Sequence, residues 1–216
     1  KGNVEKFLTV GTICSYPDKT KIPFNEKNLW NGYPAEVTAP YGLAKKILLV
    51  QSQAYYEQYD FNSIYLMPTN LYGPKDNFFE EKSHVIPALV KKVIEAKKNN
   101  YSTIRAWGSG DASREFLYVE DAADGIISAM ENYNQPVPIN LGSGKEISIK
   151  NLLKMIIDIV DYKGKVIWDK HKPEGQFRRV LNINQANKEF KFKAHTMLEK
   201  GLKKTINWYT NEQVQF

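Results

Sequence analysis

Short apolar runs alternate with amphipathic helical patterns along this chain, and that alternation constrains its fold more than any other feature. Residues 7–11 and 63–67 are apolar, β-rich runs that predict buried strands. Between them, residues 41–59 carry apolar side chains at three- and four-residue steps, which predicts a helix. Strands that alternate with helices favour an α/β fold with a mostly parallel sheet. Further strands are expected at 103–107, 116–119, 137–141 and 166–168, and further helices at 85–98, 120–131, 147–160 and 195–209.

The bulk composition is that of an ordinary globular protein. Of the 216 residues, 42% are hydrophobic and 25% charged. The chain contains neither a membrane-length apolar run nor a secretory signal pattern, so we expect a cytoplasmic protein without a membrane partner. The single cysteine, Cys14, excludes a disulfide framework and a cysteine-cluster metal site, and no metal is expected.

The formal net charge of +6 raises the question of a nucleic-acid partner. The basic residues are scattered over predicted helices, where a solvated face is their usual explanation. We therefore expect no nucleic-acid partner. A surface of this kind would still attract an anionic small molecule such as a phosphate ester.

Polar residues follow the first two predicted strands at the points where those strands end. Thr12 and Cys14 follow the first, and residues 68–74 follow the second. Open α/β sheets bind their ligands outside the carboxyl ends of the strands. A long loop with four prolines, residues 16–40, lies next to Cys14, and loops of this length are often functional. The sequence therefore predicts a site at this edge of the sheet.

Tyr41 and Lys45 are four residues apart at the start of a predicted helix, so they share one face of it. An ammonium beside a phenol favours the phenolate and lowers a pKa that is about 10 in isolation. The pair would then serve as an acid or base near neutral pH. The alternative is an exposed helix start with an unrelated lysine, because 13 tyrosines make one such pair expected by chance.

Six stretches, in order along nearly the whole chain, together resemble the GDP-L-fucose synthases, which are extended short-chain dehydrogenase/reductases of the NAD-dependent epimerase/dehydratase superfamily. The stretches are residues 11–14, 41–45, 68–74, 83–87, 107–110 and 114–116. The resemblance implies the C-terminal portion of a Rossmann-like doubly wound parallel sheet, together with a small α/β substrate-binding lobe. Residues 1–73 and part of 111–144 would belong to the Rossmann-like domain, and residues 74–110 and 145–216 mainly to the lobe.

The activity that the resemblance implies is conversion of GDP-4-keto-6-deoxy-D-mannose to GDP-L-fucose, by 3,5-epimerisation and NADPH-dependent reduction of the 4-keto group. Tyr41 would donate the proton in the reduction, Lys45 would hold the nicotinamide ribose, and Thr12 would bond the ketone oxygen. Cys14 and His84 match the base and acid of the epimerisation. Without the resemblance, Cys14 would be interpreted as a small buried side chain and His84 as a capping or packing residue.

The resemblance also implies the ligand contacts. Lysine and arginine can pair with a diphosphate, and tryptophan can pack against a base. Expected substrate contacts are Lys92, Trp107, Arg114 and Glu174. Expected NADP contacts are Val10, Gly11, Thr12, Tyr41, Lys45, Pro68, Asn70, Leu71 and His84.

The sequence departs from the family in two respects. It lacks the glycine-rich turn that cradles the cofactor pyrophosphate and starts at what should be about the fourth strand, so we expect the cofactor-binding half to be absent. The sequence thus predicts the site of an enzyme, but not necessarily a chain that is active alone. Thr12 also stands where the fucose-forming enzymes usually have serine. The sequence therefore does not determine which sugar the substrate carries.

Two alternatives remain at this stage. A related NAD(P)-dependent 4-reductase or 4-epimerase would act on another GDP- or dTDP-sugar, although retention of both Cys14 and His84 argues against a single transformation. A non-catalytic nucleic-acid- or protein-binding relative is disfavoured by the intact Thr12, Tyr41 and Lys45. The family usually forms homodimers through the helix that bears Tyr41 and the helix at 85–98. Contact candidates, which could equally face the chain's own sheet, are Val50, Ala54, Leu89 and Val93.

Overall fold

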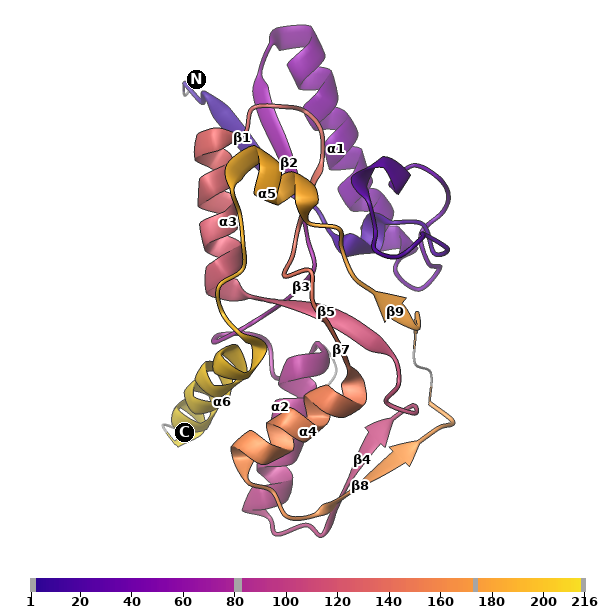
Figure 1. Cartoon of the computed structure of the whole chain (residues 1–216), viewed down its shortest axis with the longest axis vertical. Coiled ribbons are helices and arrows are strands. Elements are labelled where there is room, and N and C mark those ends of the chain that lie inside the picture. The colour runs from indigo at the N-terminus through magenta and orange to yellow at the C-terminus, as the bar shows by residue number, and fades with distance from the viewer. Residues whose placement is uncertain (1–2, 80–82, 173–174, 215–216) are drawn as a thin grey trace. The chain divides into compact units, whose positions relative to one another are not determined.

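The computed structural model describes residues 3–79, 83–172 and 175–214 of the chain. The chain forms two compact units, each assembled from three separate stretches (Figure 1). The first unit contains Lys1–Leu71, Glu115–Lys145 and Arg179–His195. The second contains Tyr72–Arg114, Glu146–Arg178 and Thr196–Phe216.

The first unit is built on a parallel sheet of three strands in the order β1-β2-β6. These strands are β1 (Lys6–Val10), β2 (Asn62–Pro68) and β6 (Ile139–Leu141). Val10 of β1 pairs with Leu66 of β2, and Leu66 also pairs with Ile139 of β6. All three strands therefore end at the same edge of the sheet.

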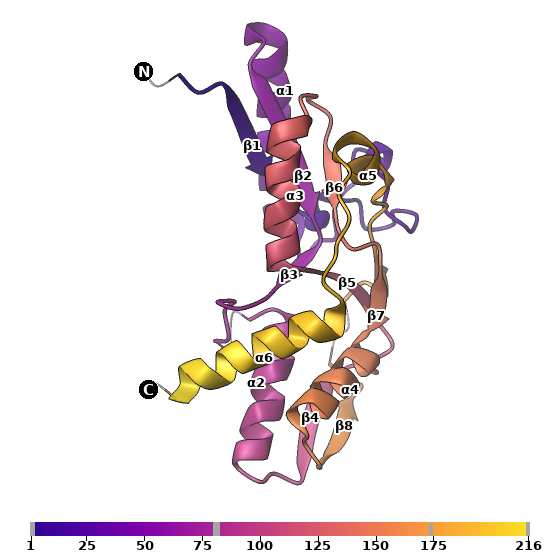
Figure 2. The same ribbon diagram turned by 60° about the vertical axis from the view of Figure 1, so that its left-hand side comes forward.

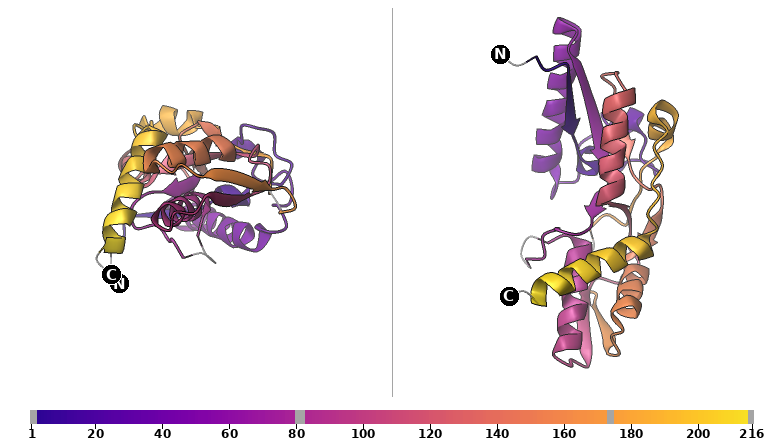
Figure 3. Two further views of the ribbon diagram at one scale, coloured as in Figure 1. Left: turned by 90° about the horizontal axis from the view of Figure 1, so that it is seen from below. Right: turned by 90° about the vertical axis from the view of Figure 1, so that its left-hand side faces the viewer.

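Helices cover both faces of this sheet. Alternate side chains of β2 point to opposite faces, and apolar residues on both faces are buried against helices. Ile64 and Leu66 join the core that includes α3 (Val119–Asn132). Tyr65 and Met67 join the core that includes Leu49 of α1. Figure 2 and the right-hand view of Figure 3 show α1 and α3 on the two sides of β1 and β2.

Helix α1 (Ala39–Tyr59) carries the predicted tyrosine and lysine. It has a proline in its first turn, Pro40, where the missing N–H costs nothing. It ends at Asp60, whose left-handed backbone (φ 50°) lets its N–H bond the carbonyl of Tyr55. Between β1 and α1 lie two short 3₁₀ turns: η1 (Ile13–Ser15) precedes the long loop, and η2 (Glu26–Asn28) lies within it.

The second unit pairs β4 (Thr103–Trp107) with β8 (Lys165–Asp169) in parallel. Helix α2 (Val85–Lys98) packs against α4 (Ile149–Val160), and α4 also contacts α6 (Leu198–Val214). Leu89 and Val93 of α2 are buried within this unit, whereas Val50 of α1 in the first unit is half exposed. Two of the four dimer-contact candidates, Leu89 and Val93, are therefore buried in the core of their own unit.

The chain passes between the units within or beside four short strands, of which the sequence predicted only β5, as residues 116–119. They are β3 (Asn70–Tyr72), β5 (Ser113–Tyr118), β7 (Glu146–Ser148) and β9 (Arg178–Arg179). The predicted division differs from the observed one at residues 179–195, which belong to the first unit. That stretch contains α5 (Asn184–Phe190), a helix that was not predicted. Its Ala186 and Phe190 join the core that contains Ile64 and Leu66.

The predicted α/β class and its parallel strands are confirmed. Among the described residues, none of the helices is both long and apolar enough to cross a membrane. The same residues contain no cluster of three histidine, cysteine or acidic side chains arranged to hold a metal ion.

Candidate active site

The first part of the candidate site is the turn that follows β1. The N–H of Gly11 donates to the carbonyl of Leu66 at 2.7 Å, which keeps this residue in the sheet. Thr12 then caps η1, because its hydroxyl oxygen accepts the N–H of Cys14 at 3.2 Å. A side chain at Gly11 would overlap the ring of Tyr65, so glycine is required there. Thr12 and Cys14 are thereby held at the carboxyl end of β1.

Helix α1 rests on η1 through Gly42. A Cβ atom on Gly42 would overlap the carbonyl oxygen of Cys14 and would lie 3.0 Å from its carbon. The hydroxyl of Ser15 donates to the carbonyl of Gly42 at 3.0 Å and completes the contact. Tyr41 precedes Gly42, so its backbone is held beside η1. Its side chain stays open to a ligand, because Tyr41 is 53% exposed.

Lys45 connects the end of β1 with Tyr41. Its ammonium donates to the carbonyl of Val10 at 2.9 Å and lies 5.9 Å from the centroid of the Tyr41 ring. A second tyrosine, Tyr65, donates its hydroxyl to the carbonyl of Lys45 at 2.8 Å. Burial raises the pKa of Tyr65 to about 12, so this phenol stays protonated at neutral pH. Tyr41 is therefore the tyrosine presented to a ligand, and Tyr65 supports the lysine.

The last residue of β2, Pro68, and the residues that follow it lie at the same edge of the sheet. Pro68 is buried, whereas Leu71 is partly exposed. The amide of Asn70 donates to the carbonyl of Glu115 at 2.8 Å, and the hydroxyl of Thr69 donates to the same carbonyl at 3.2 Å. These bonds order the stretch predicted to contact the cofactor.

Glu115 is a buried acid of the first unit to which the sequence analysis assigned no role. Its carboxylate accepts the N–H groups of Gly144 and Leu181, each at 2.7 Å. Burial outweighs these bonds and raises the pKa of Glu115 to about 7. Gly142 approaches so closely that a side chain there would overlap the carboxylate. Glu115 thus ties β5 to the turn after β6 and to the segment before α5.

The other predicted site residues lie in the second unit. His84 is exposed immediately before α2, and its side chain makes no capping bond. The Lys92 ammonium donates to the carbonyl of Arg105 at 2.7 Å. Arg114 donates to the carbonyl of Ser113 at 2.7 Å. Glu174 lies outside the described residues.

Trp107 ends β4 with 63% of its surface exposed. The ammonium of Lys172 lies 5.6 Å from the centroid of its ring, a contact that sequence reasoning missed because the two residues are far apart in the chain. An exposed indole beside a lysine is a suitable surface for an aromatic, anionic ligand.

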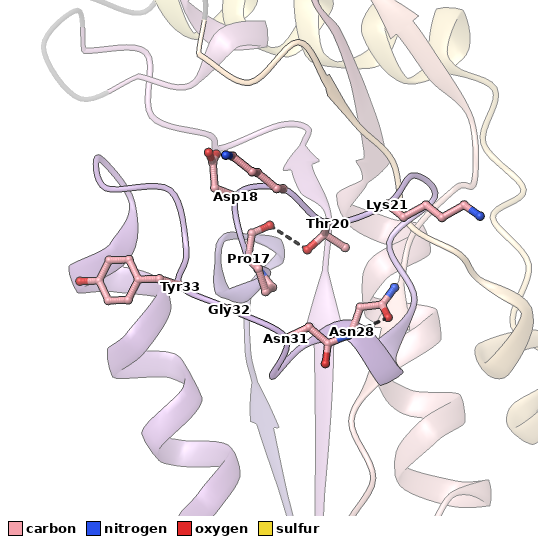
Figure 4. A pocket seen from close by; sticks show the side chains of 9 residues that line it. Pro17, Asp18, Thr20, Lys21, Asn28, Asn31, Gly32 and Tyr33 are labelled. Atoms are coloured by element: carbon pink, nitrogen blue, oxygen red, sulfur yellow. Dashed lines mark hydrogen bonds between the residues drawn. The ribbon is translucent and has the colours of Figure 1, made fainter.

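The long loop also lines a hollow of about 450 Å³ (Figure 4). Its polar groups are partly used internally: the Thr20 hydroxyl donates to the Pro17 carbonyl at 2.7 Å, and the Asn31 amide donates to the Asn28 side-chain oxygen at 3.2 Å. In the same view Lys21 points away from the hollow. The lining residues include none of the predicted site residues.

The parallel sheet covered on both faces, with Thr12, Tyr41 and Lys45 at its strand ends, defines a Rossmann-like α/β protein with a tyrosine–lysine site. Residues 1–142 match the NAD dependent epimerase/dehydratase family, and the chain belongs to this family. Both the predicted fold class and the predicted family resemblance are confirmed.

Curated relatives and solved structures agree with this assignment. The chain is 40% identical over 214 residues to the probable GDP-L-fucose synthase 1 of Oryza sativa subsp. japonica, covering 99% of this chain and 65% of that protein. It is 37% identical over 227 residues to the GDP-L-fucose synthase of Escherichia coli, covering 100% of this chain and 70% of that protein.

Among solved structures, an NADP-bound GDP-L-fucose synthetase from Naegleria fowleri has a TM-score of 0.92 at 30% identity and covers 98% of this chain and 68% of its own. A GDP-6-OMe-4-keto-L-xylo-heptose reductase from C. jejuni has a TM-score of 0.90 at 27% identity, with coverage of 97% and 71%. The chain therefore spans roughly two thirds of the length of the proteins it matches, and less than that for the rice protein.

Proposed function

We propose that the protein containing this chain converts GDP-4-keto-6-deoxy-D-mannose to GDP-L-fucose, using NADPH for the reduction. The observation that carries the proposal is the cluster of Thr12, Cys14, Tyr41 and Lys45 on η1 and the start of α1. Support comes from relatives named GDP-L-fucose synthase, and from the NADP bound in the Naegleria fowleri structure.

The residues present suit a nicotinamide cofactor. One N–H of the Lys45 ammonium bonds the Val10 carbonyl, which leaves two donors of that group for ribose hydroxyls. Leu71 presents apolar surface in β3, shortly after the end of β2. Val10, Gly11, Pro68, Asn70 and His84 complete the proposed set of contacts. NADPH, when bound, supplies the reducing equivalent.

In the reduction, Tyr41 would donate its phenolic proton to the ketone oxygen as negative charge develops there. The Thr12 hydroxyl would bond the same oxygen, although it already accepts the N–H of Cys14; its own proton remains available for donation. The ammonium of Lys45, 5.9 Å from the centroid of the Tyr41 ring, supplies the positive charge beside this proton donor.

In the epimerisation, hydrogens next to the ketone become acidic because the resulting negative charge spreads onto the ketone oxygen. We assign Cys14 as the base that removes the proton and His84 as the acid that returns one to the opposite face. Cys14 is partly exposed at the carboxyl end of β1, as a base requires. His84 is exposed with its imidazole uncommitted to capping α2.

The GDP group is assigned to the second unit. Trp107, with its exposed ring, would pack against guanine or ribose, and Lys92 and Arg114 would pair with the diphosphate. Glu174 remains the candidate for the ribose.

We also propose that the protein is a cytoplasmic homodimer. On α1, the partly exposed apolar side chains of Ile47, Val50 and Tyr55 favour burial against another surface. Light scattering of the purified protein gives the mass directly, and a monomeric mass at working concentration contradicts this assignment.

A second candidate is a GDP-sugar 4-reductase that does not epimerise, favoured by the similarity to the C. jejuni heptose reductase. The two functions separate in D2O. Epimerisation introduces deuterium at carbons 3 and 5 of the sugar, whereas reduction alone oxidises NADPH without such exchange. Exchange that disappears in Cys14→Ser supports the fucose-type function, and reduction without exchange supports the second candidate.

Ligand choice is tested first by calorimetric titration with GDP, GDP-mannose, dTDP and NADPH. Selective GDP binding that weakens in Arg114→Ala supports the assigned diphosphate contact. Lys163→Ala is the matched control, because it removes one positive charge from a solvent-exposed side chain of the same unit. Equal weakening in both variants indicates a general charge effect, and binding of dTDP in preference to GDP contradicts the proposed substrate.

A further inference from the structure

The residue two positions after Cys14 is held by a buried side-chain network that the proposed chemistry does not use. Tyr16 ends η1, and its side chain is only 2% exposed. Its hydroxyl donates to the side-chain oxygen of Asn140 at 2.8 Å. Asn140 lies in β6 and is fully buried. Strand β6, the last in the order β1-β2-β6, therefore holds the turn that carries Cys14.

Asn140 uses every hydrogen-bonding group of its side chain. The amide nitrogen donates to the carbonyl of Phe24 at 2.9 Å and to the carbonyl of Asn182 at 3.1 Å, while the amide oxygen accepts from Tyr16. Its backbone N–H donates to Glu26 at 3.0 Å. One amide thus joins η1, the long loop, β6 and the segment before α5, and an amide is required because it offers both donors and an acceptor.

The ring of Tyr16 is fixed independently of its hydroxyl. It packs against the ring of Phe24, with the two centroids 5.1 Å apart. Phe24 is itself held by a bond from its N–H to the carbonyl of Val180 at 2.8 Å. Loss of the hydroxyl alone would therefore leave the core packed while it releases the link to Asn140.

On its other side, η1 is held by α1 through the bond from Ser15 to the carbonyl of Gly42. Cys14 thus lies between two anchors, one that leads to Tyr41 and one that leads to β6. Thr12 has a separate anchor, because Gly11 beside it bonds the strand β2 directly. Removing the β6 anchor would consequently disturb Cys14 more than Thr12 or Tyr41.

We propose that Tyr16 and Asn140 are positioning residues that set the location of Cys14 and so control epimerisation more than reduction. This inference rests on the function proposed above for Cys14. A buried amide oxygen that loses its partner is unfavourable, and the surrounding segments move to restore a bond. A catalytic group displaced by about 1 Å can lose on the order of 100-fold in rate, so a partial displacement is expected to cost about tenfold.

The test uses Tyr16→Phe in the full-length protein. One assay follows deuterium uptake at carbons 3 and 5 in D2O without NADPH. The other follows NADPH oxidation with a 4-keto sugar that is already epimerised. We expect exchange to fall about tenfold and reduction to change less than about twofold.

Tyr133→Phe is the matched control. Tyr133 is a buried tyrosine of the same unit whose hydroxyl donates to the carbonyl of Val137 at 2.9 Å, away from η1. Both rates should stay at the wild-type level in this variant. Equal losses of exchange and reduction in Tyr16→Phe, or no loss of exchange, would overturn the proposal.

A second measurement needs no turnover. The alkylation rate of Cys14 by iodoacetamide, located by peptide mapping, reports the surroundings of this thiol. It should change in Tyr16→Phe and in Asn140→Ser but not in Tyr133→Phe. If the wild-type protein neither exchanges nor reduces the GDP-keto sugar, the proposed function fails, whereas the alkylation comparison still decides whether Tyr16 and Asn140 position Cys14.

Discussion

Replacing Gly42 with alanine tests how α1 is seated on the turn that carries Thr12 and Cys14. In an exposed helix, Gly→Ala stabilises a protein by about 1 kcal/mol, because alanine restricts the unfolded chain and favours the helix. At Gly42 the new Cβ would overlap the Cys14 carbonyl oxygen and lie 3.3 Å from Cα of Ser15. The two effects have opposite signs, so the sign of the result is informative.

The overlap involves backbone atoms, which cannot rotate away as a side chain can. The start of α1 and η1 must therefore separate by about half an ångström, and overpacking of this kind costs about 1–3 kcal/mol. After subtraction of the helical gain of about 1 kcal/mol, the free energy of unfolding should fall by up to about 2 kcal/mol. Because Tyr41 precedes Gly42, kcat/KM should also fall, by roughly 10- to 100-fold.

Urea unfolding followed by circular dichroism, together with steady-state NADPH oxidation, measures both quantities. Gly125→Ala is the comparison, because its Cβ would meet only side chains, at 2.7 Å from Leu141 and 2.8 Å from Phe192. That variant should keep full activity. A Gly42→Ala protein that is more stable than wild type and equally active would refute the proposed seating of α1 on η1.

Two further outcomes are expected. Tyr41→Phe should lower NADPH-dependent reduction by about 10²- to 10⁴-fold and leave the calorimetric affinity for GDP unchanged, because it removes a proton donor but no diphosphate contact; a loss of GDP affinity would contradict that role. Glu115 has a pKa raised by burial to about 7 in the folded protein, so the folded state holds this proton up to a higher pH than the unfolded state. The stability it contributes is complete below about pH 4.5 and declines by about 3 kcal/mol as pH rises through 7. In urea unfolding at several pH values, the stability of wild type relative to Glu115→Gln should fall over this window, and a constant difference would show that Glu115 does not titrate abnormally.

The position of the candidate site could be predicted from local sequence patterns. Periodicity placed α1 within two residues of its observed start, and the four-residue spacing of Tyr41 and Lys45 put both on one face of that helix. The placement of Thr12 and Cys14 after a buried strand indicated the ligand-binding edge of the sheet. These features depend on residues close together in the chain, which is why one sequence is enough to infer them.

The supports of the site could not be predicted in this way. Tyr16 and Asn140 are separated by 124 positions, and no local pattern marks either residue as the partner of the other. Helix α5 is only seven residues long and contains few apolar residues, so its place in the first core depends on Ala186 and Phe190 meeting the sheet.

The sequence by itself therefore determined the order of the longer strands and helices and the chemical groups at the strand ends, because the repeat distances of strands and helices are set by neighbouring residues. Only the tertiary structure decided that Gly42 seats α1, that Tyr65 supports Lys45, and that Asn140 anchors the turn carrying Cys14. Each of those contacts joins segments distant in the chain, and its energy exists only once the sheet has brought them together.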